Sequence, residues 1–206
     1  MKKLYKLSII LLILLFPAFA FAGGGATTMM MGTSGAAVAT CGDLATARTD
    51  GDISQAISDG TTGMVSSAIT ATASGTALTV YVKISDVGTP PGYLYAYLCP
   101  SDGSNPASGT ALDACVQSTT TNIGPPGASS VDVKYKFAGY SITNTSVYHI
   151  VLNPSVAGDA SNYYRWLCNR TATNTGGMDQ DADGTPAWTS IDTSAQCNFR
   201  VTSCDE

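Results

Sequence analysis

Glutamate is almost absent from this chain of 206 residues. Fourteen of its 15 acidic residues are Asp, and the single Glu is the last residue, Glu206. Glycosidases work with two carboxyl groups that flank a cleft, yet no spaced pair of Asp residues lies beside aromatic residues on a predicted strand. Histidine occurs once, as His149, without a Gly-x-Ser-x-Gly turn, and we expect it to be structural or superficial. We therefore expect no enzyme, and a glycoside hydrolase-like activity is the least favoured function.

Basic residues are also scarce, and Cys-x-x-Cys pairs are missing. The chain has 10 Lys and Arg residues against 15 acidic ones, and loss of the three N-terminal lysines would leave seven against 15, a net charge of −8. Such an acidic chain repels nucleic acids and anionic membranes, so neither is an expected partner. Zinc sites use cysteine pairs or cysteines with histidines, and without a Cys-x-x-Cys pair we expect none.

The N-terminus has the pattern of a secretory signal peptide. Lys2, Lys3 and Lys6 precede the apolar run "LSIILLILLFPAFAFA". Ala20 and Ala22 supply the small residues that a signal peptidase needs for cleavage. The apolar run is too short and wrongly flanked for a good membrane span, so no membrane insertion is expected after cleavage. We predict a signal peptide over residues 1–22, a flexible Gly-, Thr- and Met-rich lead over 23–45 and one domain over 46–206, secreted to the periplasm or the cell exterior.

Short alternating segments predict strands along most of the domain, while the strong helix formers Glu, Lys and Arg are scarce. In "ALTVYVKI" (77–84) Leu78, Val80, Val82 and Ile84 would share the buried face. In "YLYAYLC" (93–99) the leucines alternate with tyrosines, and 131–137 alternates in the same way. Further strands are expected at 53–57, 64–72, 111–119, 146–153, 162–168 and 197–203. The fold class that follows is an all-β, antiparallel two-sheet β-sandwich.

Six cysteines in an exported chain predict three disulfides. Cys99 and Cys115 bracket one loop between two predicted strands. Cys168 shares a side of its strand with Trp166, and Cys197 shares one with Phe199, so this pair can meet if those faces are buried. Cys41 and Cys204 are then left to tie the two ends together.

The segment "YHIVLNPSVAGDASNYYRW" resembles a β-sandwich module of secreted bacterial proteins. The upstream "TALTVYVKISDVGTPPGYLYAYL", the later "DGTPAWTSID" and the final "FRV" fit the same pattern, which covers residues 52 to 203. Such jelly-roll modules are similar to the choice-of-anchor and carbohydrate-binding-like domains of cell-surface proteins. The resemblance implies a jelly-roll fold and a binding role, and it implies no catalytic residue because none defines the family.

Aromatic residues are the candidate ligand-binding groups, since sugars pack on aromatic faces with polar neighbours. Tyr93, Tyr95 and Tyr97 form a one-sided row, and Tyr163 and Trp188 belong to a later aromatic group. Packing within the core or across strands is the competing interpretation. The expected function is binding or surface display, with a glycan or cell-surface ligand as partner. The alternative is a structural, self-associating surface protein.

The segment "GMDQDADGTPAWTSID" (177–192) opens like a calcium loop. Asp179, Asp181 and Asp183 would supply carboxylates and Thr185 a carbonyl, as in the first part of an EF-type loop. The closing position holds Ser190 in place of Glu, which favours a polar hairpin tip. Calcium is the candidate cofactor, and both interpretations stay open.

Overall fold

The computed structural model describes residues 41–60, 63–103, 112–121, 127–169, 178–181, 188–192 and 195–205. The predicted signal peptide and most of the predicted lead lie outside the described residues. All regular structure in the described part is β-strand, so no helix there is long and apolar enough to cross a membrane. The predicted all-β class is therefore confirmed.

Twelve strands make up the described fold. They are β1 (Ile53–Ile57), β2 (Met64–Thr70), β3 (Gly75–Val87), β4 (Leu94–Pro100), β5 (Val116–Gln117), β6 (Val131–Ile142), β7 (Val147–Pro154), β8 (Tyr163–Asn169), β9 (Met178–Asp181), β10 (Thr189–Asp192), β11 (Gln196–Cys197) and β12 (Phe199–Thr202).

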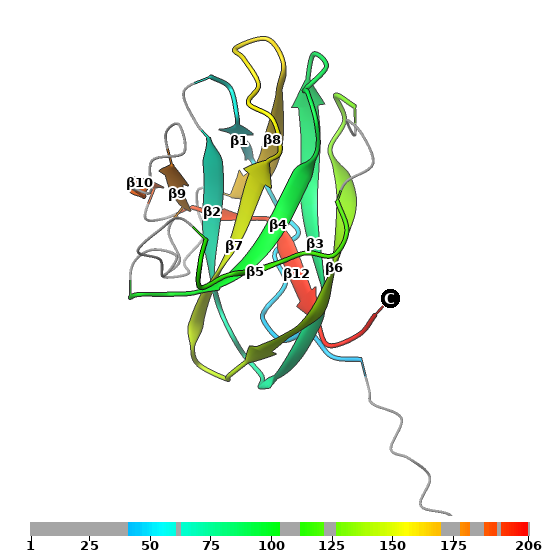
Figure 1. Cartoon of the computed structure of the whole chain (residues 1–206). Coiled ribbons are helices and arrows are strands. Elements are labelled where there is room, and N and C mark those ends of the chain that lie inside the picture. The colour runs from blue at the N-terminus through cyan, green and yellow to red at the C-terminus, as the bar shows by residue number, and fades with distance from the viewer. Residues whose placement is uncertain are drawn as a thin grey trace, which may run out of the picture. The chain divides into compact units, whose positions relative to one another are not determined.

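The strands form two antiparallel sheets that enclose one main core (Figure 1). The first sheet has the order β1-β8-β3-β12, with β6 paired to β3 and β11 paired to β8. The second sheet has the order β10-β9-β2-β7-β4-β5. Every pairing is antiparallel, and most neighbours in a sheet are distant in sequence, as in other sandwiches.

The core forms where the inward positions of the two sheets meet. Val80, Val82 and Ile84 of the first sheet and Leu94 and Leu98 of the second are all buried. Trp166 lies among them, fully buried, and its Nε1 donates a hydrogen bond to the backbone oxygen of Asn198 at 2.8 Å. The alternation expected for 93–99 is therefore confirmed, and in 131–137 it holds at Tyr135 and Phe137, which are buried, whereas Val131 is exposed.

The alternation predicted for 77–84 is wrong at Leu78, the first of the four residues expected on the buried face. The register shifts between Ala77 and Thr79, where residues 137–139 of β6 stand opposite Leu78 alone. A bulge of this kind changes which residues face inward. Ala77 is consequently fully buried in the core, and Leu78 is half-buried next to Gly139.

The strand predicted over 111–119 is mostly a turn. Cys115 donates its backbone N–H to the carbonyl of Leu112 at 3.0 Å, and only Val116 and Gln117 pair with β4.

Two strands of the structure, β9 and β10, are not predicted from the sequence, because "MDQD" and "TSID" carry no apolar alternation. They pair with each other, and β9 also pairs with β2.

The three predicted disulfides are all present: Cys41–Cys204, Cys99–Cys115 and Cys168–Cys197. Cys168 and Cys197 face each other directly across the β8–β11 pair. Disulfides of this number are typical of proteins in oxidising compartments.

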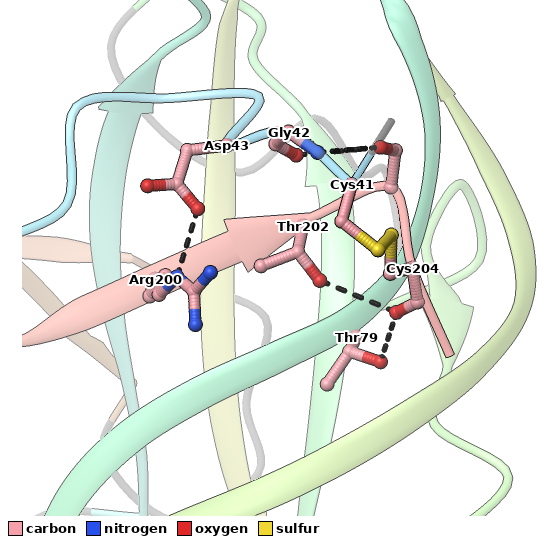
Figure 2. The surroundings of a disulfide bond; sticks show 8 residues. Cys41, Gly42, Asp43, Thr79, Arg200, Thr202 and Cys204 are labelled. Carbon is pink, nitrogen blue, oxygen red and sulfur yellow. Dashed lines mark hydrogen bonds and ion pairs between the residues drawn. A yellow bond between two sulfur atoms is a disulfide. The ribbon is translucent and has the colours of Figure 1, made fainter. Parts of the chain in front are cut away.

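The first described residues belong to the sandwich, although 23–45 was expected to be a flexible lead. Leu44 is buried in the core, and its backbone N–H bonds to the carbonyl of Val201 at 2.8 Å. Figure 2 shows the Cys41–Cys204 disulfide beside this segment, with Arg200 donating to Asp43 at 2.8 Å and Thr79 donating to the carbonyl of Cys204 at 2.6 Å.

Candidate functional site

The tyrosine row lies on the outer face of the second sheet. Leu94, Ala96 and Leu98 point into the core, so Tyr95 and Tyr97 point outward and are half-buried. Tyr93, just before β4, has 48% of its surface exposed. The row therefore lies outside the main core, and packing across strands and ligand binding both stay open for it.

Asn153 is the polar neighbour of the row. It stands directly opposite Tyr95 in the β4–β7 pair, and a hydrogen bond joins it to the Tyr97 side chain. Burial raises the pKa of Tyr97, the hydrogen bond to Asn153 opposes that rise, and Tyr95 adds to it. The Tyr97 hydroxyl is therefore protonated at neutral pH and can donate as well as accept a hydrogen bond.

Trp188 reaches the same face from the loop before β10. Trp188 and Tyr97 both pack against a small cluster on the outer face, formed by Met64, Cys99 and Val151. The Trp188 Nε1 is buried and has no hydrogen-bond partner among the described residues. We call Tyr93, Tyr95, Tyr97, Asn153 and Trp188 together the β4–β7 face. Its aromatic carbons, amide and unpaired indole N–H are groups that bind polar, ring-shaped ligands.

Tyr163 does not belong to this face. It lies in β8 of the first sheet, opposite Val87. The guanidinium of Arg165 stacks over its ring at 5.4 Å and donates to its hydroxyl at 3.0 Å. The five predicted ligand-binding residues are thus divided, with four on the second sheet or its loops and Tyr163 on the first.

Two of the four predicted calcium ligands lie in a strand. Asp179 and Asp181 belong to β9, where Asp179 stands opposite Ser66 of β2 and Ser190 of β10. Asp183 and Thr185 lie outside the described residues. Within the part of the chain that the structure describes, no group of three or more His, Cys, Asp or Glu side chains is placed to hold a metal. The antiparallel β9–β10 pair agrees with the hairpin interpretation, and calcium binding stays a prediction.

His149 is buried on the outer side of β7 and is held by two serines. Its Nδ1 lies 2.8 Å from the Ser66 hydroxyl, and its Nε2 lies 3.2 Å from the Ser101 hydroxyl. Burial lowers the pKa of His149 from 6.5 to about 4, against an opposing effect of Asp102. The imidazole is therefore neutral at pH 7, where a base this weak supplies little general-base catalysis. Sequence spacing could not reveal the two serines, which are 83 and 48 residues away.

Comparison of the chain with protein-family models, curated proteins and solved structures finds no match in any of the three. The resemblance to jelly-roll modules of cell-surface proteins therefore stays a prediction. The residues of this chain are the basis on which a function can be assigned.

Proposed function

We propose that this is a secreted, non-catalytic β-sandwich protein that binds neutral carbohydrate through the β4–β7 face. Sugars offer apolar C–H faces to aromatic rings and hydroxyls to polar side chains. The observation that carries the proposal is the grouping of Tyr95, Tyr97 and Asn153 beside Trp188, whose buried Nε1 has no partner among the described residues. A ligand hydroxyl would accept a hydrogen bond from that N–H.

Further observations support this proposal. No Lys or Arg belongs to any strand of the second sheet, so this face suits an uncharged ligand. His149, the one histidine, is buried and neutral between two serines, which makes it a structural residue in this account. The three disulfides agree with function outside the cytoplasm.

Self-association is the second candidate. Tyr93 and Val156 are 48% and 50% exposed, and the turn at Gly92 brings them close together. Exposed apolar side chains that lie side by side are common in contacts between copies of a protein. A surface protein that assembles through this end of the sandwich would use Tyr93 without using Trp188.

Alanine in place of Tyr97 is expected to weaken carbohydrate binding about tenfold, because a central aromatic contact contributes at least that much to affinity. The measurement is binding of the protein from residue 23 onward to an array of neutral oligosaccharides derived from cellulose, xylan, mannan, chitin and starch. Affinities for the best ligand are then compared among variants.

Tyr163→Ala is the matched control, because it removes the same side chain from the other sheet. Its affinity should stay within about twofold of the unmodified protein. The proposal fails if no oligosaccharide binds, or if Tyr163→Ala weakens binding as much as Tyr97→Ala. Absence of binding together with concentration-dependent assembly would establish the self-association alternative.

A further inference from the structure

A groove lies on the outer face of the first sheet. It has a volume of about 310 Å³, within the range of about 300 to 1,000 Å³ typical of small-ligand sites. It runs across β12, β3 and β6, with the segment around residue 48 at one end. The charged residues among its lining are Arg48, Lys83, Asp132 and Arg200, and Tyr81 and Asn198 also line it. We call this the basic groove.

Asn198 has an unpaired side-chain amide in this groove. Asn198 lies between β11 and β12 and is one of the residues that line the groove. The residue is only 2% exposed, and neither its Oδ1 nor its Nδ2 has a hydrogen-bond partner among the described residues. A buried amide left unpaired costs stability, commonly about 1 to 3 kcal/mol. Such a group calls for a partner that the described residues do not supply.

The cations of the groove are incompletely neutralised. Lys83 forms no ion pair with any residue that the structure describes. The Nε of Arg48 is buried without a partner, although its NH1 lies 3.5 Å from Asp50. Arg200 is paired with Asp43 at 2.8 Å and stacks over Tyr81 at 5.7 Å. Lys83 and Arg48 are therefore the positions at which a ligand anion gains most.

Charge is strongly segregated in this acidic chain. Of the described residues, every Lys and Arg belongs to the first sheet or pairs with it: Arg48, Lys83, Lys134, Lys136, Arg165 and Arg200. Alternation with core residues turns the strand members among them to the outer face. Asp50, Asp205 and Asp43 pair with three of these cations and Asp132 stands opposite Lys83, so any positive potential on this face is local.

We propose that the basic groove binds an acidic saccharide, a sugar ring that carries a carboxylate beside its hydroxyls. The carboxylate would be held by Lys83 and Arg48. One ring hydroxyl would pair with Asn198, because a hydroxyl can both donate to the Oδ1 and accept from the Nδ2. Asp132 stands opposite Lys83 and would repel an anion beside it, so the carboxylate would lie toward Arg48 while Asp132 accepts from another hydroxyl. The site is on the opposite sheet from the β4–β7 face and does not depend on it.

The first test compares three probes by calorimetric titration of the protein from residue 23 onward: galacturonic acid, galactose and acetate. Galacturonic acid should bind at least about tenfold more tightly than either of the others, since only it offers both the charge and the hydroxyls. The proposal is overturned if galacturonic acid does not bind, or if galactose or acetate binds equally well.

The second test uses Asn198→Leu, a substitution of similar size. It should abolish the preference for galacturonic acid and also raise the midpoint of thermal unfolding by about 2 to 4 °C, because it removes two unpaired buried polar atoms. A purely structural asparagine would lower the midpoint on substitution, and that result would contradict the proposal.

Lys83→Gln and Lys134→Gln form a matched pair, since both remove one positive charge from the same face. Lys134 is paired opposite Tyr81 but is not part of the groove lining. Lys83→Gln should weaken galacturonic acid binding about tenfold and Lys134→Gln by less than about threefold. Equal losses would indicate a diffuse charge effect and would overturn the assignment of the site.

Discussion

Joint replacement of Cys41 and Cys204 by serine is expected to lower the free energy of unfolding by about 5 kcal/mol. The disulfide joins residues 163 positions apart, so it closes nearly the whole domain into one loop. In the chain-entropy model its effect comes from restricting the unfolded chain, and that effect grows with loop length. The loss would take away much of the stability of a typical domain, which is about 5 to 15 kcal/mol.

The native contacts around this disulfide do not need its sulfur atoms. Gly42 and Ser203 hydrogen-bond to each other, Arg200 pairs with Asp43, and Thr202 donates to the carbonyl of Cys204 at 3.2 Å (Figure 2). The double variant should therefore keep the native fold at low temperature. Its denatured state should expand, and the dependence of the unfolding free energy on urea concentration should become steeper.

Urea denaturation measures this effect, with the Cys99→Ser, Cys115→Ser double variant as the control. That disulfide spans 16 positions, so its loss should cost about 3 kcal/mol. A smaller loss for Cys41–Cys204 than for Cys99–Cys115 would contradict the view that the longer loop contributes more.

Acidification from pH 6.5 to pH 4 is expected to remove up to about 3 kcal/mol of stability through His149 alone. The pKa of this histidine is lowered from 6.5 to about 4 in the folded protein, with burial as the main cause. Between those values the unfolded chain binds a proton that the folded protein excludes. The contribution is therefore complete above pH 6.5 and is lost as the pH falls toward 4.

His149→Gln is the variant that isolates this effect, because it keeps a polar side chain near Ser66 and Ser101 without the titrating ring. The unmodified protein should lose stability over this pH range, and the difference between the two proteins should shrink toward pH 4. Asp159 and Asp205, whose pKa values are lowered by hydrogen bonds, lose their contributions only as the pH falls below 3.8.

Nuclear magnetic resonance provides the direct check, since the chain has one histidine and its ring signals need no assignment among others. The ring signals should titrate near pH 4 in the folded protein. A midpoint near 6.5, or parallel pH profiles for the two proteins, would show that burial does not control this residue.

Much of the fold was predictable because strand alternation and cysteine placement are local signals. The side of β4 that carries Leu94 and Leu98 is the buried side, as the sequence pattern predicts. Cys168 and Cys197 were paired correctly, since each shares its strand face with residues that are now found in the core. The error at Leu78 arose from a bulge that depends on the partner strand β6, which alternation within one strand cannot reveal.

The candidate sites were less predictable because they combine distant parts of the chain. Tyr97 and Trp188 share one outer-face cluster, whereas Tyr163 belongs to the other sheet, and only the strand order separates them. Asn153 was overlooked even though it alternates with Val151 and His149 along β7. The unpaired amide of Asn198 could not be foreseen. This residue lies between β11 and β12 and is buried where the chain packs against Leu167 of β8, which is distant in sequence.

The two tryptophans allow the central claim, ligand binding at the β4–β7 face, to be tested most directly. Trp166 is fully buried in the core, and Trp188 packs at the edge of that face. The best-binding neutral oligosaccharide is titrated while tryptophan fluorescence is recorded for the Trp166→Phe and Trp188→Phe variants. A saturable change that Trp166→Phe retains and Trp188→Phe loses is the predicted result. A change that persists in Trp188→Phe and vanishes in Trp166→Phe would contradict the claim.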